Sequence, residues 1–450
     1  MEKLTLGEIC RAAACRYSGP PQLLQQPVKD IVTDSRAVNS GMLFAAIPGQ
    51  HVDGHDYIPA ALAAGAIAAL GEKPMPRETG PYLLVDNTER ALGDIARNYR
   101  RLFPAEVIGI SGSVGKTSCK EMIASVLAQE LVVLKTEGNF NNALGLPLTL
   151  FRLNHSHQVA VIEMGISDFG EMRYLAGIAG PNAAVLTNIG DAHLEQLHDR
   201  QGVLAAKTEM LELLPDGATV YLNGDDHLLA AFQPPARLHT VRFGLGENCE
   251  FRAERLHETA DGLDLQINSV PLHVYAYGSY NAYSALAAFA LGRAYGLSDA
   301  AIRNGVAAFS PPRGRGNIIR TPYLHIVDHS YNANPVSMRA ALDSLHGKAR
   351  RCIAVLGDMN ELGENSADMH RELGRYAAQA GFSPLICIGE KARDICSGAQ
   401  QAGADARWYP DVDAATAVLP DLLQKDDLVL VKASNSMQLG RIVEALQAFR

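Results

Sequence analysis

Apolar and polar residues alternate through the middle of the chain in the order of strands followed by helices. A short apolar run at Val107–Ile110 precedes a glycine-rich turn, and apolar residues then recur at helical spacing over Thr117–Glu130. Two further apolar runs, Val159–Ile162 and Ala184–Thr187, have the length of buried strands. This alternation predicts a parallel sheet covered by helices.

The pattern changes further along the chain. Between residues 239 and 277 apolar positions alternate with period two, most clearly in Leu263–Ile267 and Leu272–Tyr275, which predicts hairpins attached to the central domain. Helices are then expected over Asn281–Tyr295 and 298–309.

A proline- and glycine-rich stretch, Ser310–Gly316, marks the clearest domain boundary. Beyond it, three apolar runs predict central strands of a second α/β sheet, namely Ile353–Leu356, Leu385–Ile388 and Leu428–Val431. We therefore predict an α/β protein of three domains: residues 1–100, a central parallel-sheet domain over 101–312, and a C-terminal doubly wound, Rossmann-like domain over 313–450.

Composition narrows the class of partner. The 450 residues are 47% hydrophobic and 20% charged, which suits several cores, and the net charge of −9 disfavours nucleic acid and anionic lipid as partners. The longest membrane candidate, Ile58–Leu70, is too short to span a bilayer, so we expect no membrane insertion. The start lacks the charged-then-apolar order of a signal peptide. Seven cysteines without a C-x-x-C pair argue against a disulfide framework. We expect a cytoplasmic protein.

The sharpest local signal lies between the first predicted strand and helix of the central domain. A glycine-rich loop there presents backbone N–H groups and a helix N-terminus to phosphate, which predicts a P-loop domain that binds a nucleoside triphosphate. Lys116 is placed to reach the β- and γ-phosphates, and the Thr117 hydroxyl to ligate Mg²⁺. A glycine-rich turn with an incidental lysine is the structural alternative. The candidate residues are Ser111, Gly112, Ser113, Val114, Gly115, Lys116 and Thr117.

Glu163 directly follows the predicted strand Val159–Ile162. A carboxylate at the end of a strand beside a phosphate loop is placed to hold Mg²⁺ near the γ-phosphate. The alternative is a solvated carboxylate at a strand end. His193 and Lys207 follow downstream, and each taken alone reads as an ordinary surface residue.

With these features the chain resembles the Mur ligases, the ATP-dependent amide-forming enzymes of peptidoglycan precursor synthesis. The resemblance runs through all three stretches in order, and it rests on Thr33–Arg36, Gly41–Ala46, Asp53–His55, the phosphate loop, Gly138–Pro147, Asp328–Pro335 and Gly357–Gly363. The last two strings point to the member that adds a dipeptide. The D-N-P-R string of the diamino-acid-adding relative does not occur in the sequence.

The resemblance implies a mechanism and a set of roles. ATP would phosphorylate the C-terminal carboxylate of UDP-N-acetylmuramoyl-tripeptide, and the amine of D-alanyl-D-alanine would attack the acyl phosphate. Two Mg²⁺ ions are implied, with Lys207 carbamylated. The implied metal ligands are Thr117, Glu163, His193 and Lys207, and the implied catalytic residues are Lys116, Glu163, His193, Lys207 and Arg315. Further ATP contacts are implied for Asn281, Arg315, Asp328, Asn332 and Asn334, and substrate contacts for Ser35, Arg36, Phe44, His55, Asn139 and Asn142.

Two positions depart from the family pattern. Ser284 replaces the second asparagine of an H-N-x-x-N string, which weakens an adenine contact there, and Asn435 replaces an arginine that could grip a carboxylate with two hydrogen bonds. Alternative functions are another Mur-type ligase that adds a single amino acid, a folylpolyglutamate-synthase-like enzyme, a nucleotide-sugar-binding module, and, from a different class, a P-loop ATPase switch. We expect a monomer.

Overall fold

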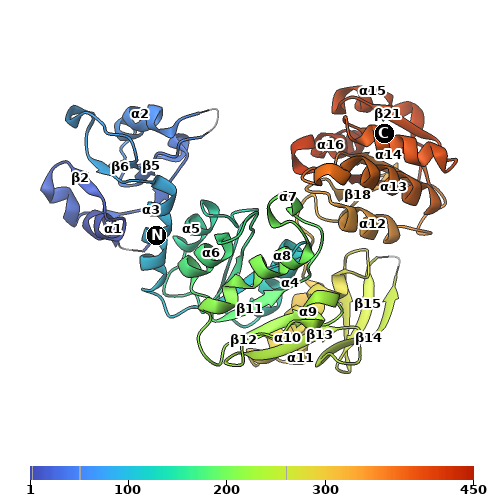
Figure 1. The fold of residues 1–450 in the computed structure, drawn as a ribbon, viewed down its shortest axis with the longest axis horizontal. Helices are drawn as coiled ribbons and strands as arrows, with labels where there is room; N and C mark the ends of the chain where they lie inside the picture. Colours follow the sequence, from blue (N-terminus) through green and yellow to red (C-terminus); the bar gives the residue numbers. More distant parts are fainter. Residues whose placement is uncertain (3, 50–51, 260, 450) are drawn as a thin grey trace.

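The computed structural model describes residues 1–2, 4–49, 52–259 and 261–449. Three α/β units follow one another along the chain, and the first and third lie at opposite ends of the central one (Figure 1). This arrangement confirms the three-domain α/β fold predicted from the sequence. No helix in the described ranges has the length and apolarity needed to cross a membrane.

The N-terminal domain is built on a five-stranded sheet of order β2-β7-β6-β5-β4, in which β4 to β7 run parallel and β2 is an antiparallel edge strand. The strands are β2 (Arg16–Ser18), β4 (Ile31–Val32), β5 (Leu43–Ala45), β6 (Ala68–Gly71) and β7 (Tyr82–Leu84), beside a two-stranded ribbon of β1 (Leu4–Thr5) and β3 (Pro27–Val28). The α-helices are α1 (Leu6–Ala12), α2 (Ile58–Ala63) and α3 (Thr88–Arg100). Short 3-10 helices are η1 (Pro21–Gln25), η2 (Ser35–Ala37), η3 (Gly54–Tyr57) and η4 (Arg77–Thr79).

Helix α3 joins this domain to the next. Asn87 caps its N-terminus by accepting a hydrogen bond from the Arg90 N–H at 2.7 Å. Its apolar face packs against α5 (Gly145–Leu150) and α6 (Glu171–Ala179) of the central domain. Tyr99 is fully buried there and donates to the carbonyl of Leu153 at 2.8 Å. The two domains therefore share one continuous apolar core.

One disulfide was not expected from the cysteine pattern. Cys10 and Cys15, at the end of α1, form a bridge with their Cα atoms 5.2 Å apart. The other five cysteines are free and buried, so the bridge is a single local link and not part of a framework. A five-residue spacing across a helix end carries no signature, which explains why the sequence did not indicate it.

The central domain contains a nine-stranded sheet of order β16-β15-β14-β13-β12-β11-β8-β10-β9. Strands β8 and β10 lie side by side in it and are almost wholly buried, as both faces of a helix-covered parallel sheet require. The strands are β8 (Glu106–Ser111), β9 (Val133–Lys135), β10 (Val159–Glu163), β11 (Ala183–Leu186), β12 (Thr219–Asn223), β13 (His239–Gly244), β14 (Phe251–Glu258), β15 (Leu263–Ile267) and β16 (Val270–Val274). The predicted strands of this domain are confirmed.

The prediction of hairpins over 239–277 was wrong for its first part. Strand β13 pairs parallel with β12, and β14 pairs parallel with β13. Among the described residues of this stretch, the antiparallel pairs are β14 with β15 and β15 with β16. A period of two shows which side chains of a strand face a core, but it carries no information on the direction of the neighbouring strand. The central sheet is therefore one continuous sheet, where the sequence had indicated a core with separate hairpins.

Helices cover the central sheet. Helix α4 (Lys116–Leu127) starts one residue before the predicted helix and stops three residues earlier than predicted. The predicted helices near 281–309 are present as α10 (Asn281–Ala294) and α11 (Asp299–Ala307). The remaining helices are α5, α6, α7 (Leu194–Leu197), α8 (Arg200–Thr208), η5 (Glu209–Leu213) and α9 (His227–Ala231).

Helix α10 offers a test of the packing. Phe289 on this helix is fully buried, and its ring centre lies 6.0 Å from that of Phe251. We expect Phe289→Ala to lower the free energy of unfolding by about 3–5 kcal/mol, because the transfer energy of the ring is lost and a cavity remains. Thermal or urea unfolding followed by circular dichroism measures it. Leu102→Ala, at a side chain that is 52% exposed, should change stability by less than about 0.5 kcal/mol; equal losses would contradict the burial of α10.

The C-terminal domain is a six-stranded sheet of order β17-β18-β22-β19-β20-β21, parallel except for β17. Its strands are β17 (Asn317–Arg320), β18 (Leu324–His329), β19 (Cys352–Gly357), β20 (Phe382–Ile388), β21 (Ala406–Tyr409) and β22 (Asp427–Lys432). The helices are α12 (Pro335–Asp343), η6 (Gly363–Asn365), α13 (Ser366–Gln379), α14 (Ala392–Gln401), α15 (Val412–Leu422), η7 (Asn435–Met437) and α16 (Gly440–Ala448). Alternate strand residues enter two apolar clusters, one with α12 to α14 and one with α15 and α16, which confirms the doubly wound fold.

Candidate active site

The phosphate loop connects β8 to α4, and two of its glycines are required by the backbone. Gly115, the N-cap of α4, has φ of +79°, in the left-handed region that other residues avoid. Gly112 has φ of +152°, and a Cβ there would collide with the hydroxyl of Thr187. The loop therefore brings its backbone N–H groups to the N-terminus of α4, where phosphate is favoured.

The loop is held in shape by the segment that follows β11. The Val114 N–H donates to Asn188 Oδ1 at 2.9 Å, and the Ser113 hydroxyl accepts from the Gly190 N–H at 2.8 Å. On the other side, the Ser111 hydroxyl donates to the carbonyl of Met164 at 2.9 Å. The predicted phosphate-loop serines thus support the loop from both flanks.

Lys116, the first residue of α4, lies over this loop. Its Nζ donates to the Gly112 carbonyl at 2.7 Å. Burial lowers the pKa of Lys116, and the charge of Arg315 in the C-terminal domain lowers it further, while Glu163 acts in the opposite direction. The ammonium is therefore placed to pair with an anion that binds in the loop.

Glu163 ends β10 and is 1% exposed. Its Oε2 accepts from the Thr117 hydroxyl and its Oε1 from the Asn141 amide, both at 2.8 Å. Lys120 Nζ is 3.9 Å from Oε2, is fully buried, and also donates to the Thr136 carbonyl at 2.6 Å. The carboxylate is thus fixed beside the start of α4.

Thr117 and Glu163 fit a site for Mg²⁺. A hydroxyl and a carboxylate are the hard oxygen ligands that this ion prefers, and Mg²⁺ commonly takes one or two protein ligands together with water and substrate phosphates. Over the described ranges no three or more His, Cys, Asp or Glu side chains are grouped closely enough to hold a metal by themselves. Phosphate oxygens would therefore have to complete the ligand set.

His193 and Lys207 lie close enough to this loop to affect each other's charge. Lys207, on α8, is 1% exposed, and burial together with the charge of Lys116 moves its pKa well below the usual value for lysine. Burial is also the main cause that lowers the pKa of His193, with Glu361 opposing it and Lys207 adding to it. The charge of Lys116 thus lowers the pKa of both predicted residues.

The C-terminal domain contributes two further cations. The Arg315 guanidinium is 3.8 Å from the centre of the Tyr331 ring. Lys432, at the end of β22, is 4% exposed and donates to the Asn332 carbonyl at 2.7 Å. Burial and the charge of Arg315 lower the pKa of Lys432 to about 7.

Sequence reasoning did not select Lys432 as a site residue. The signal was a lysine directly after an apolar strand, and only the structure shows that this lysine is buried and that the charge of Arg315 affects it.

The other predicted nucleotide residues shape the backbone in this structure. Asp328 accepts from the Gly314 N–H at 3.1 Å, which fixes the turn that carries Arg315. Asn281 donates to the Tyr277 carbonyl at 2.8 Å, and Asn334 caps α12. Asn332 is exposed. Their contacts with adenine or ribose stay predictions.

The Gly138–Pro147 string provides one contact that the sequence did not identify. Asn142 accepts from the Gly145 N–H at 2.9 Å and so begins α5, while Asn139 is exposed. Asn141, between the two, is the residue that reaches Glu163. Adjacent asparagines look alike in a sequence, and the turn decides which one faces the site.

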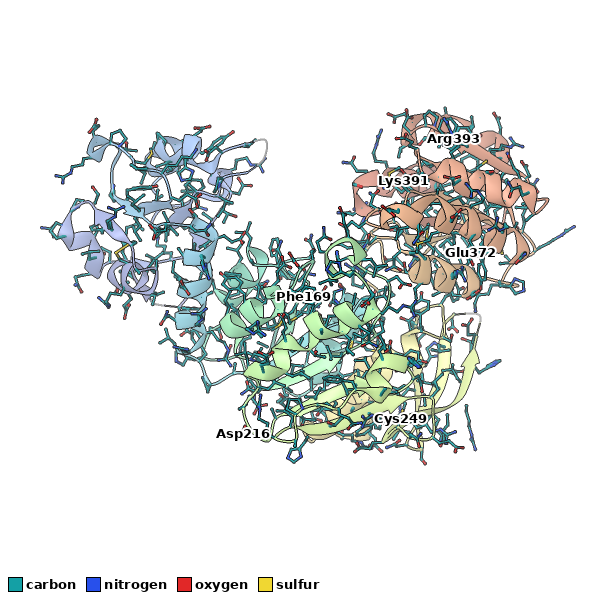
Figure 2. The ribbon with its side chains drawn as sticks, viewed as in Figure 1. Phe169, Asp216, Cys249, Glu372, Lys391 and Arg393 are labelled. Carbon is teal, nitrogen blue, oxygen red and sulfur yellow. A yellow bond between two sulfur atoms is a disulfide. The ribbon has the colours of Figure 1, made fainter. Side chains whose placement is uncertain are left out.

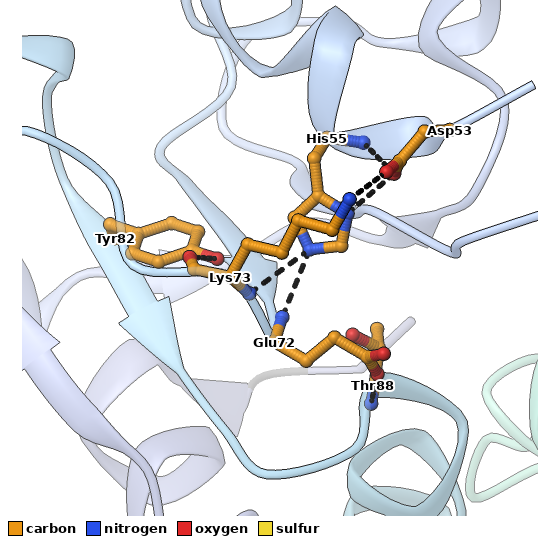
Figure 3. A network of polar contacts seen from close by, with 6 residues as sticks. All are labelled: Asp53, His55, Glu72, Lys73, Tyr82 and Thr88. Carbon is orange, nitrogen blue, oxygen red and sulfur yellow. Dashed lines mark hydrogen bonds and ion pairs between the residues drawn. The ribbon is translucent and has the colours of Figure 1, made fainter.

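The predicted nucleotide-sugar residues lie in the N-terminal domain, and one of them, His55, belongs to a polar network (Figure 3). His55 is 5% exposed; its Nδ1 is 2.6 Å from Asp53 Oδ1, and its Nε2 accepts from the Glu72 N–H at 3.0 Å. Lys73 pairs with Asp53, and its side chain is 57% exposed. Both nitrogens of His55 are therefore engaged within the protein, and the network ties together two loops of this domain.

The other three predicted residues of this domain do not share one surface. Phe44 is 1% exposed and packs in a small core with Ile58 and Tyr82. Arg36 is exposed and pairs with Asp34 at 2.8 Å, and Ser35 is half-buried. Contacts from this domain to a substrate stay predictions.

Comparison with known protein families agrees with this architecture. The Mur ligase middle domain matches residues 110–292, the Mur ligase glutamate ligase domain matches 314–435, and the Mur ligase family catalytic domain matches 27–100. The matches follow one another along the chain in the order of the three domains.

Curated relatives cover nearly the whole chain. A UDP-N-acetylmuramoyl-tripeptide–D-alanyl-D-alanine ligase of Bacillus subtilis (strain 168) is 34% identical over 95% of this chain and 94% of its own length. The enzymes of the same name from Synechocystis sp. and Escherichia coli (strain K12) are 36% and 34% identical, over 94% and 93% of this chain and 92% and 93% of their own.

Solved structures agree in fold. A crystal structure of MurF from Acinetobacter baumannii matches with a TM-score of 0.90 at 29% identity and covers 100% of this chain and 99% of its own. MurF from Thermotoga maritima in complex with ADP matches at 0.82 and 27% identity, over 94% and 97%. The resemblance seen in the sequence motifs is confirmed: the chain belongs to the Mur ligase family.

Proposed function

We propose that this protein is an ATP-dependent ligase that joins D-alanyl-D-alanine to the C-terminal carboxylate of UDP-N-acetylmuramoyl-tripeptide. The observation that carries the proposal is the phosphate loop, where Lys116 donates to the Gly112 carbonyl and the Glu163 carboxylate accepts from Thr117 at the start of α4. Arg315 lowers the pKa of both Lys116 and Lys432, and Lys116 lowers that of Lys207. Such like-charge crowding is unfavourable unless a polyanion such as ATP enters. The relatives that carry this activity in their names match over more than nine-tenths of the chain.

The chemistry requires neutralisation of charge in both steps. A carboxylate oxygen of the tripeptide attacks the γ-phosphorus of ATP, and ADP leaves. The dipeptide amine then attacks the acyl phosphate carbonyl, loses a proton, and inorganic phosphate leaves as the amide forms. Lys116 and Arg315 would stabilise the phosphate oxygens from opposite domains. Mg²⁺ bound by Thr117 and Glu163 would supply further charge neutralisation.

We propose that Lys207 is a metal ligand, a role that the positive charge of an ordinary lysine would prevent. An ammonium beside Lys116 and a metal ion would repel both. Burial lowers the pKa of its amine well below the usual value for lysine. The neutral form of the nitrogen can attack CO₂ and release a proton, which gives a carbamate with a negative charge. That carbamate and His193 are the ligands we propose for a second Mg²⁺.

The alternative functions have less support. A folylpolyglutamate synthase of Mycobacterium tuberculosis shares the fold at 16% identity and a TM-score of 0.63, over 79% of this chain. A P-loop switch would hydrolyse ATP without either ligase substrate, and a sugar-binding module would leave Lys116 and Glu163 unexplained. Because ATP and nucleotide-linked precursors are cytoplasmic molecules, we infer a cytoplasmic enzyme. It would act as a monomer, because one chain carries all three domains.

Phosphate release tests the proposal. With Mg²⁺ and ATP, release should require both the UDP-linked tripeptide and D-alanyl-D-alanine, and omission of either should leave only background. Comparing tripeptides that end in lysine or in diaminopimelate defines specificity at the third residue. Turnover with a single amino acid in place of the dipeptide would assign the chain to a different Mur-type ligase, and release with neither substrate would favour the switch.

A further inference from the structure

A contact between domains reaches one of the proposed metal ligands. His193, in the loop after β11 of the central domain, has its Nδ1 3.0 Å from Oε2 of Glu361. Glu361 follows β19 of the C-terminal domain and belongs to the Gly357–Gly363 string, to which the mechanism above gives no role. The contact therefore links a motif without an assigned task to the active site.

Both residues are held in an unusual backbone conformation. His193 has φ of +54° and Glu361 φ of +62°, which is the left-handed region that residues with a Cβ seldom adopt. Such conformations persist where the surrounding structure enforces them, and they concentrate at functional sites. The pair thus combines two strained positions from two domains in a single contact.

The C-terminal domain holds the loop before Glu361 rigidly. The Asn360 N–H donates to the Ser434 hydroxyl, and the Asn360 side-chain amide donates to the Ser436 hydroxyl, each at 2.9 Å. Lys391, which Figure 2 labels on this domain, donates to Asn360 Oδ1 at 2.8 Å. Glu361 therefore extends from a fixed support, although its own side chain is 62% exposed.

The loop before His193 is fixed to the phosphate loop. Asn188 Nδ2 donates to the Val114 carbonyl at 2.9 Å, and the Ser113 hydroxyl donates to the Gly190 carbonyl at 3.2 Å. The Glu361 carboxylate contacts His193, and the loop before His193 is hydrogen-bonded to the phosphate loop, where ATP would bind.

The contact can set which nitrogen of the imidazole ring is available to bind a metal ion. A histidine that ligates a metal through one ring nitrogen commonly donates its other N–H to a carboxylate, which fixes the tautomer and the ring orientation. Glu361 Oε2 is 3.0 Å from Nδ1, and an Nδ1–H that donates to it would leave the lone pair of His193 on Nε2. That nitrogen is then free to accept a cation.

We propose that Glu361 is a positioning residue for His193: it holds the ring with Nε2 free for the second Mg²⁺, and it makes completion of that cation site depend on the approach of the C-terminal domain. The proposal rests on the proposed function for the identity of the cation site. It extends that function, because it links metal binding to domain closure through one named carboxylate.

Mn²⁺ binding tests this without any turnover. Mn²⁺ is titrated into the full-length protein with a non-hydrolysable ATP analogue and the UDP-linked tripeptide, and electron paramagnetic resonance counts the bound ions. Wild type should bind two ions. E361Q, which keeps the shape of the side chain, should weaken the second ion by about 10–100-fold and leave the first unchanged.

Matched variants separate positioning from general damage. E364Q changes an exposed glutamate three residues further along and should bind both ions as wild type does. H193A should lose the second ion, and E361Q combined with H193A should lose nothing more. Small-angle X-ray scattering should show compaction on Mn²⁺ addition in wild type and less in E361Q.

The outcomes are decisive in both directions. Wild-type affinity for the second ion in a folded E361Q protein would overturn the proposal, and so would a wild type that binds a single ion or compacts without Mn²⁺. Failure of the proposed function is seen separately, as phosphate release that does not require the dipeptide, because the Mn²⁺ count does not depend on which amine is the acceptor.

Discussion

Replacement of Lys116 by alanine is expected to lower kcat by on the order of 10²–10³-fold, the range seen when one donor to a developing negative charge is removed. Lys116 Nζ makes its hydrogen bonds to the carbonyls of Gly112 and Ser113. In the reaction the same ammonium would instead meet the phosphate oxygens, both when the γ-phosphoryl group transfers and when phosphate leaves. The loss should therefore appear in the chemical step.

The fold should survive this change. The conformation of the loop depends on the backbone of Gly112 and Gly115 and on the contacts to Asn188. Alanine removes the Lys116 hydrogen bonds to the Gly112 and Ser113 carbonyls and leaves these other features in place. Circular dichroism and thermal unfolding check this, and Lys425→Ala, at an exposed lysine of the C-terminal domain, serves as a control that should keep full activity. A folded Lys116→Ala protein with most of its phosphate release would remove this residue from the mechanism.

Much of the fold could be predicted because buried strands and helices leave distinct patterns. The runs that became β8, β10 and β19 are apolar at nearly every position, which is typical of strands covered on both faces. The direction of β13 could not be predicted, since its half-buried residues fit either pairing. Direction is set by the path of the connecting chain and not by the strand itself.

The site was predictable only in part for a related reason. Lys116 and Thr117 begin the helix that follows β8, and Glu163 ends the neighbouring strand β10. Motif context and strand ends were therefore enough to bring the three residues together. Glu361 comes from another domain and reaches His193 through the placement of that domain. The charge of Lys432 is affected by Arg315 of its own domain. No spacing in the sequence encodes that approach.

The second large effect is expected at Lys207. Lys207→Ala should lower turnover by on the order of 10²-fold or more, because the carboxylate that the carbamate supplies to the cation site would be lost. The position itself argues for this chemistry. Lys207 is 1% exposed, and burial together with the charge of Lys116 moves its pKa well below the usual value, which favours the neutral amine that attacks CO₂. Enzyme prepared with ¹³C-labelled bicarbonate should show a carbamate carbon signal by NMR that the variant lacks.

Chemical rescue distinguishes a lost carboxylate from a lost cation. Formate, acetate or propionate should restore part of the activity of Lys207→Ala, since each can place a carboxylate in the space left by the side chain. The same acids should do nothing for Lys116→Ala, where a positive charge is missing. A folded Lys207→Ala protein that no short carboxylate rescues, together with wild type that gives no carbamate signal, would show that Lys207 acts as a neutral amine, and the second cation would then need another ligand beside His193.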